Sequence, residues 1–135
     1  MERVKLIQLP KILDPRGNLS FFESNNQLPF IIKRSYWLYD VPGGELRGSH
    51  AFKKANEFIV ALSGSFDIIL NDGNREAKYN LNRSYYGLFV PSLIWRRIEN
   101  FSTNSVALVV SSMFYNENEY IRDFDEFKKI KYEKK

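Results

Sequence analysis

Three residue types in this chain are suited to moving protons on a small polar molecule. His50 is the only histidine, and an imidazole, with an ordinary pKa of about 6.5, is the side chain best matched to proton transfer near neutral pH. Arg96 keeps its positive charge in any ordinary environment, which suits it to stabilising an enolate or holding a phosphate or keto oxygen. Tyrosine hydroxyls can donate hydrogen bonds to such a ligand, and the candidates are Tyr36, Tyr39, Tyr85 and Tyr86.

The composition excludes several other kinds of chemistry. The chain has no cysteine, which rules out disulfides, thiolate zinc sites and cysteine nucleophiles. No apolar run approaches the roughly 20 residues that cross a bilayer, and the start, MERVKLIQLP, lacks the features of a signal peptide, so we expect a cytoplasmic protein without a membrane partner. Much of the net charge of +4 comes from the tail FKKIKYEKK, and without a continuous basic stripe we expect no nucleic-acid partner.

The elements that must position these residues are short strands. Stretches rich in β-branched and aromatic residues alternate with turn signals such as DPRGN, VPGG and NDGN, a pattern that predicts an all-β fold. We expect one domain over residues 1–135, with strands over about 3–112. Asp72-Gly73 separates two alternating runs and predicts a tight hairpin. Farther on, apolar residues recur every three or four positions and predict a helix over about 117–131, capped by Asn116 or Asn118.

The spacing around His50 and Arg96 resembles that of both cupin motifs. The first motif, H-x-H-x(4)-E-x(6)-G in the family, corresponds here to His50, Phe52, Glu57 and Gly64. The second motif, P-x-G-x(2)-H-x(3)-N, corresponds to Pro91, Leu93, Arg96 and Asn100. The resemblance implies a small single-domain cupin barrel, a jelly roll, followed by the short C-terminal helix.

The ligands that a metal-binding cupin needs are mostly missing. Such a site brings three imidazoles and a carboxylate to one ion, and only His50 and Glu57 remain here. Arg96 would put a positive charge where the cation should lie, and the cupin spacing selects it, rather than its neighbour Arg97, to face inward. We therefore expect no bound metal and no cofactor.

Two orientations stay open at this level. Tyr36 and Trp37 are neighbours in a predicted strand, so they point to opposite faces and only one of them enters the barrel. Glu57 either faces the barrel interior or forms a surface salt bridge with Arg47 or Lys54.

Longer stretches resemble the sugar 3,4-ketoisomerases of the WxcM-like cupin family. They are DPRGNLSFFE, PFIIKRSYWLYDVPGGELRGSHAFKKANEFIVALSGSFDIILNDG and NEYIRDFDEFKK, and together they extend from about Lys11 to Lys129. The resemblance implies an isomerase that converts dTDP-4-keto-6-deoxyglucose into a dTDP-3-keto-6-deoxyhexose. A proton would move from C3 to C4 through an enediolate, with no cofactor or metal.

Site residues follow from the resemblance position by position. His50 and Tyr36 are assigned to catalysis. Contact with the dTDP-linked keto sugar is assigned to Arg16, Arg34, Arg47, Lys53, Trp95 and Arg96. The departure is Phe52, because well-known members carry a second histidine there. His50 would then move the proton with Tyr36 or a water molecule as its partner.

Two other functions remain open. A nucleotide-sugar 3,5-epimerase is also a metal-free barrel with a histidine base, although this chain offers no obvious aspartate partner for that base. A non-catalytic sugar or nucleotide binder would explain Phe52. In each case, the edge strands expected of a small barrel predict a homodimer.

Overall fold

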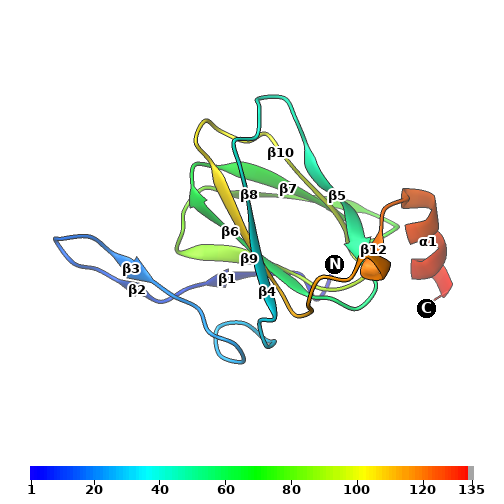
Figure 1. Ribbon diagram of the computed structural model, residues 1–135, viewed down its shortest axis with the longest axis horizontal. Helices are drawn as coiled ribbons and strands as arrows, with labels where there is room; N and C mark the ends of the chain where they lie inside the picture. The colour runs from blue at the N-terminus through cyan, green and yellow to red at the C-terminus, as the bar shows by residue number, and fades with distance from the viewer. Residues whose placement is uncertain (134–135) are drawn as a thin grey trace.

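The computed structural model describes residues 1–133, which form two five-stranded antiparallel sheets facing each other (Figure 1). The first sheet has the spatial order β1 (Lys5–Gln8), β9 (Tyr86–Val90), β6 (Glu57–Ser63), β11 (Val106–Ser111) and β4 (Arg34–Tyr39). The second has the order β12 (Tyr120–Ile121), β5 (Arg47–Phe52), β10 (Trp95–Glu99), β7 (Phe66–Asn71) and β8 (Glu76–Leu81). The predicted all-β barrel with a C-terminal helix is confirmed.

The main core fills the space between the two sheets. The strands β6 and β7, each flanked by a strand on both sides, carry continuous apolar runs, FIVAL and IIL, as expected for strands buried in a sandwich. Ile59 on β6, Ile68 on β7 and Val109 on β11 are fully buried in one cluster. Burial of apolar side chains at this density supplies most of the stabilisation of a small barrel.

The hairpin between β7 and β8 forms where it was predicted. Asn71 pairs with Glu76, so the connection runs from Asp72 to Arg75 and is longer than a two-residue turn. The Asp72 carboxylate accepts hydrogen bonds from the backbone N–H groups of Asn74 and Arg75. Gly73 has a φ of +94°, a conformation that glycine adopts without a steric penalty.

The predicted helix over about 117–131 is wrong at its start, and strands extend past residue 112. A short 3₁₀ helix, η1 (Glu117–Glu119), with Asn116 as its cap, leads into β12, which pairs with β5. The α-helix α1 (Phe124–Glu133) begins only after Asp123, whose carboxylate accepts from the N–H groups of Asp125 and Glu126. Lys134 and Lys135, the end of the predicted domain, lie outside the described residues.

Buried Glu119 explains why the chain is not helical before Asp123. Its carboxylate accepts hydrogen bonds from the backbone N–H groups of Lys54 and Ala55, with the bond to Ala55 at 2.7 Å. This ties η1 to the turn between β5 and β6, and the chain then continues as a strand. No helix within residues 1–133 has the length and apolar character to cross a membrane.

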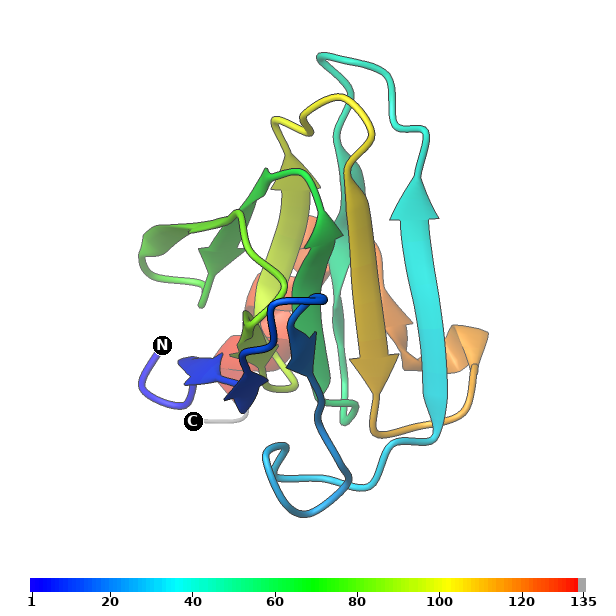
Figure 2. The same cartoon turned by 90° about the vertical axis from the view of Figure 1, so that its left-hand side faces the viewer.

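A small hairpin stands away from the two main sheets. Its strands are β2 (Lys11–Ile12) and β3 (Leu19–Ser20), and they pair only with each other among the described residues. Figure 1 shows this hairpin projecting from the barrel on the side opposite α1. Figure 2 shows β4 at the open edge of the first sheet, next to β11.

Candidate functional site

The centre of the candidate site is a cross-strand pair on the inner face of the second sheet. His50 on β5 lies directly opposite Arg96 on β10, and directly opposed residues share one face of a sheet. Both side chains are buried, and Arg96 is the largest of the fully buried side chains among residues 1–133. Its neighbour Arg97 instead pairs with Glu99 at 2.6 Å near the surface. The predicted inward orientation of Arg96 is confirmed.

Arg96 is held by a carboxylate and a phenol from the opposite sheet. Its Nε donates to Oε1 of Glu57 at 2.9 Å, and its Nη2 lies 2.8 Å from the same oxygen. Nη2 also donates to the Tyr36 hydroxyl at 2.7 Å, and that hydroxyl donates in turn to Oε2 of Glu57. The three groups form a closed and fully satisfied polar cluster.

This cluster decides the two orientations that the sequence left open. Tyr36 faces the barrel, while Trp37 is 55% exposed on the outer face. Glu57 is 1% exposed and pairs with Arg96, so its alternative as a surface partner of Arg47 or Lys54 is wrong. The physical reason is that a buried arginine requires a buried counter-charge.

Burial and charge fix the protonation of the cluster. The pKa of Tyr36 is raised well above its usual value, and burial is the largest cause. The charge of Arg96 lowers this pKa, but the charge of Glu57 and its hydrogen bond raise it again. Burial lowers the pKa of Arg96, but its contacts with Glu57 and Tyr36 more than offset this, and the net pKa is raised. Tyr36 is therefore a neutral phenol and Arg96 a permanent cation.

His50 lies in contrasting surroundings. Its ring meets Phe52 edge-on at 4.8 Å and Tyr120 at 4.9 Å between ring centroids. Its Nε2 is buried and has no hydrogen-bond partner within residues 1–133. Burial first, then the charges of Arg96, Arg122 and Arg34, lower the pKa of His50 to about 2. The imidazole is neutral at physiological pH and keeps an uncommitted nitrogen.

A glycine permits His50 and Arg96 to approach each other. A Cβ on Gly48 would lie 2.4 Å from Nη1 of Arg96 and 3.8 Å from Cε1 of His50. The Gly48 carbonyl accepts a 3.4 Å hydrogen bond from the same Nη1. Gly48 also has a φ of +72° and lies where the pairing of β5 with β10 shifts register.

The same irregularity places Arg47. Strict alternation would put Arg47 and His50, three positions apart, on opposite faces of β5. The register shift instead sets Arg47 opposite Ile98, whose side chain is buried in the main core, so Arg47 begins β5 on the His50 face. Arg47 is exposed there, at the opposite end of β5 from Phe52.

Arg34 on β4 extends the positive charge beside Tyr36. Its guanidinium lies 4.8 Å from the centre of the Tyr36 ring, and its Nη2 donates to the Tyr120 hydroxyl at 3.2 Å. Its Nε is buried without a hydrogen-bond partner in the described chain. Tyr120 in turn lies under the Arg122 guanidinium at 4.4 Å. The structure thus adds Tyr120 and Arg122 to the candidate site.

Sequence reasoning missed these two residues because the pattern after residue 116 was interpreted as helical. Tyr120 and Ile121 fit the helical spacing, yet they form β12 against β5. Two features of the sequence could have indicated the strand. Tyr120 and Arg122 are two positions apart, as on one face of a strand, and the acidic residues before them do not continue an apolar helical stripe.

Three residues assigned to the substrate lie elsewhere in the monomer. Trp95 is adjacent to Arg96 and so faces the opposite side of β10, where it packs against Phe124 at 5.3 Å and Phe127 at 5.7 Å. Lys53 is exposed beyond the end of β5. Arg16 lies in the turn between β2 and β3, with 90% of its side chain exposed, and pairs with Asp14 at 2.9 Å. The structure does not bring these residues to His50.

The residues around His50 do not fit a bound cation. Both carboxylate oxygens of Glu57 are engaged by Arg96 and Tyr36, and the Arg96 guanidinium lies beside the imidazole. Residues 1–133 contain no cluster of three or more His, Asp or Glu side chains of the kind that holds a metal. The Arg96 guanidinium already supplies the positive charge that pairs with Glu57.

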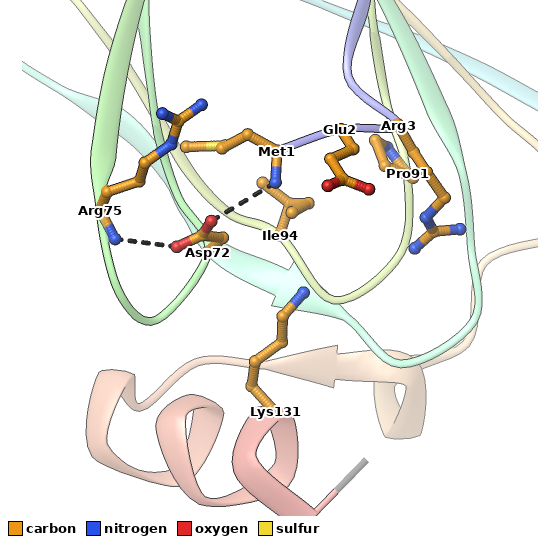
Figure 3. Close-up of a pocket in the computed structure, with 8 residues that line it drawn as sticks. All are labelled: Met1, Glu2, Arg3, Asp72, Arg75, Pro91, Ile94 and Lys131. Atoms are coloured by element: carbon orange, nitrogen blue, oxygen red, sulfur yellow. Dashed lines mark hydrogen bonds and ion pairs between the residues drawn. The ribbon is translucent and has the colours of Figure 1, made fainter. Parts of the chain in front are cut away.

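A separate pocket of about 490 Å³ lies where the β7–β8 and β9–β10 turns approach α1 (Figure 3). Several of its charged groups are engaged in local contacts. The Met1 ammonium pairs with Asp72 at 3.4 Å, and Lys131 donates to the Leu93 carbonyl at 2.7 Å. None of the residues assigned to the site from the sequence lines this pocket.

The fold and this site define a cupin-type barrel with a buried arginine–glutamate pair beside a neutral imidazole. The chain belongs to the FdtA family, described as WxcM-like, C-terminal, whose profile matches residues 2–132. The family predicted from the sequence is confirmed.

Relatives of known activity cover nearly the whole chain. A TDP-4-oxo-6-deoxy-α-D-glucose-3,4-oxoisomerase of Aneurinibacillus thermoaerophilus is 42% identical over 125 residues, which is 93% of this chain and 90% of that protein. A 3,4-ketoisomerase from Helicobacter canadensis has a TM-score of 0.94 and 41% identity, covering 96% of this chain and 98% of the other. A variant of the 3,4-ketoisomerase QdtA from Thermoanaerobacterium thermosaccharolyticum, in complex with TDP-4-keto-6-deoxyglucose, has a TM-score of 0.93 and 33% identity over 96% and 94%.

Proposed function

We propose that this chain is a sugar 3,4-ketoisomerase that converts TDP-4-keto-6-deoxyglucose into a TDP-3-keto-6-deoxyhexose. The observation that carries the proposal is the neutral imidazole of His50, with its uncommitted Nε2, beside a cation and a phenol held in fixed positions. The relatives of matching length supply the reaction class, since those named above are 3,4-ketoisomerases or a 3,4-oxoisomerase.

In this mechanism His50 moves the proton on carbon. The C3 hydrogen is acidic because it lies next to the C4 carbonyl, and the free Nε2 accepts it as the electron pair moves into an enediolate. The imidazolium then returns a proton to C4. The low pKa of His50 in the free protein keeps it neutral and ready to accept, and the anionic substrate and intermediate raise that pKa during the reaction.

Arg96 and Tyr36 act on the oxygen atoms. As the C3 proton leaves, negative charge develops on O4, and donors already fixed in place stabilise it without reorganisation. An O3 lone pair then forms the C3 carbonyl while the electron pair of the C3–C4 double bond takes the proton from His50 at C4. The proton lost from O3 neutralises O4 as a hydroxyl. Tyr36 stays protonated because its pKa is raised, and its O–H is held by Glu57, so it can accept a hydrogen bond from a sugar hydroxyl through its remaining lone pair.

The nucleotide end of the substrate meets the remaining cations. Arg34 lies between the rings of Tyr36 and Tyr115, with a buried, unpaired Nε. Arg47 lies exposed on the face that also carries His50. The two arginines lie toward opposite ends of β5, and a guanidinium at either end suits a phosphate oxygen. The proposal includes no metal and no cofactor, and it places the reaction in the cytoplasm, with the nucleotide-linked substrate.

We also propose that the protein works as a homodimer. The β2–β3 hairpin exposes Ile12, Leu13 and Leu19 by 54%, 69% and 53%, and a two-stranded hairpin standing alone is marginally stable in water. The open edge of β4 offers unpaired backbone groups and the exposed rings of Trp37 and Tyr39. Arg16 reaches a substrate only if this hairpin contacts a second subunit. Mass measurement in solution tests the dimer.

The reaction is tested in deuterated water with TDP-4-keto-6-deoxyglucose. We expect a 3-keto product with deuterium at C4, detected by NMR. A 3,5-epimerase would instead exchange at C3 and C5 and leave the carbonyl at C4. Tight binding of TDP with neither exchange nor product would show a non-catalytic binder, the outcome that Phe52 in place of a second imidazole favours, and would refute the proposal.

A further inference from the structure

Glu57 is a buried acid for which the mechanism above has no direct use. It is the first residue of β6 and is 1% exposed. Its two carboxylate oxygens are divided between two partners, with Oε1 receiving Arg96 and Oε2 receiving the Tyr36 hydroxyl. A buried carboxylate that only neutralised Arg96 would have no need of the phenol.

The direction of the Tyr36 hydrogen bond depends on this carboxylate. An ionised carboxylate accepts and never donates, so the single O–H of Tyr36 points to Glu57. The Arg96 Nη2 donates to the same hydroxyl oxygen, which leaves one lone pair of the phenol uncommitted. The carboxylate therefore sets both the orientation of the phenol and the side on which it can meet another group.

Glu57 also sets the position of the guanidinium. With Nε and Nη2 bound to Oε1, the remaining Nη1 is directed toward Gly48 and the His50 ring. Without this contact Arg96 would be a mobile cation in a closed space, and its charge beside His50 would be uncompensated. Both changes oppose the formation of an imidazolium during turnover.

We propose that Glu57 is a positioning residue that holds Arg96 and Tyr36 as one unit and compensates the charge next to His50. This inference rests on the proposed ketoisomerase function. Glu57 does not touch the sugar and acts only through its two partners.

The test compares Glu57→Gln with Glu119→Gln, since Glu119 is a second buried glutamate whose bonds go only to backbone N–H groups. An amide at 57 keeps the shape but reverses the bond to Tyr36 and removes the charge. We expect kcat to fall about 100-fold, the scale of misplacing a reacting group, with the KM and TDP affinity unchanged. Glu119→Gln should keep kcat within a few-fold of wild type.

A double-mutant cycle with Tyr36→Phe separates positioning from general destabilisation. If Glu57 acts through the phenol, Glu57→Gln adds little to the loss already caused by Tyr36→Phe. Full additivity of the two losses would overturn the inference, and so would equal kcat losses in Glu57→Gln and Glu119→Gln. An inactive wild-type enzyme would count against the proposed function and leave the positioning role to the next measurement.

That measurement uses the folded wild-type protein, in case Glu57→Gln does not fold. The Arg96 Nε–H, fully buried and bound to Glu57, should give a slowly exchanging ¹H–¹⁵N signal. The signal should persist in Tyr36→Phe, which leaves the ion pair intact. Rapid exchange of this proton in the wild-type protein would refute the fixed position of Arg96.

Discussion

The candidate site has two halves, one around Arg96 and one around His50, whose surroundings differ in polarity. Around Arg96, every polar group of the Glu57–Tyr36–Arg96 cluster has a partner. Around His50, the contacts are aromatic, from Phe52 and Tyr120, and the buried nitrogen has no partner in the described residues. A charge is thus fixed permanently on one side, while the other side favours a neutral base.

This contrast teaches how a barrel of cupin type can work with one imidazole. A base in apolar surroundings resists protonation until an anionic ligand arrives, and a paired guanidinium provides a fixed donor without attracting a metal. Phe52 belongs to the half around His50, because its ring contacts both His50 and Tyr120. Substitutions on either side of the site test this division between a fixed charge and a neutral base.

Removing the base should have the largest effect. We expect His50→Asn to lower kcat by about 10⁴-fold, the upper range for loss of a general base, while TDP affinity stays near that of wild type. The measurements are turnover of the keto sugar and calorimetric binding of TDP. Retention of more than a tenth of the activity would mean that the base lies in the other half of the site.

Pushing the two halves apart should have the next largest effect. Gly48→Ala adds a Cβ 2.4 Å from Arg96 Nη1 at a residue with a φ of +72°. We expect kcat to fall about 100-fold and the free energy of unfolding to decrease by about 2 kcal/mol, because both the donor and the backbone must shift. Gly43→Ala, where the Cβ would meet nothing within 4 Å, is the control.

The apolar half should also be visible in the pH dependence of stability. The pKa of His50 is about 2 when folded against 6.5 when unfolded, so below pH 6.5 the unfolded chain takes up a proton that the folded chain does not. Stability is therefore fully present above pH 6.5 and falls by up to about 1.4 kcal/mol per pH unit as the pH decreases.

Urea titrations of wild type and His50→Gln between pH 7 and 4.5 measure this slope. Their difference isolates the imidazole from the carboxylates with lowered pKa values, which titrate at lower pH. Because His50 is the only histidine, its ¹⁵N signals in tag-free protein report the same titration directly. An imidazole that titrates near pH 6.5 in the folded protein would contradict the burial argument.

Restoring an imidazole at position 52 should change activity less. The Phe52 ring is 5% exposed and packs against both His50 and Tyr120, with a 4.6 Å separation between its centroid and that of the Tyr120 ring. A histidine there would face the aromatic half and not the polar cluster. We expect Phe52→His to alter kcat by less than about tenfold, with Phe52→Leu as the packing control. A larger increase would show that the missing imidazole limits the rate.

The smallest effect is expected at the edge of the aromatic half. Tyr120→Phe keeps the ring against His50 but removes the hydroxyl that accepts from Arg34. We expect the KM to rise a few-fold with kcat unchanged, the order of one lost hydrogen bond of about 1 kcal/mol. Tyr115→Phe, whose hydroxyl donates to exposed Glu117, is the control. A fall in kcat without a change in KM would assign Tyr120 to the chemistry.

Much of this arrangement could be predicted because it follows from local periodicity. Alternation along β10 separates Arg96 from Arg97, and the motif spacing selects the buried one. The Asp72-Gly73 pair predicted a hairpin that forms. Three residues that the sequence assigned to the site, Arg34, Tyr36 and His50, converge in the structure. Their roles stay predictions.

Trp95 and Arg47 show where periodicity was insufficient. Trp95 was assigned to the same site as its neighbour Arg96, although alternation already places the two on opposite faces of β10. For Arg47 the reverse holds, because only the register shift at Gly48 brings it to the His50 face. A bulge adds one residue to one strand, and its position depends on the partner strand.

The sequence by itself determined the barrel, the buried arginine, the solitary imidazole and the family, because these depend on residue type and on spacing along one strand. The tertiary structure alone decided that Glu57 pairs with Arg96 and Tyr36, that Tyr120 covers His50 and that the C-terminal helix begins at Phe124. Those outcomes depend on which groups from distant segments must satisfy one another once water is excluded, and no single segment contains that information.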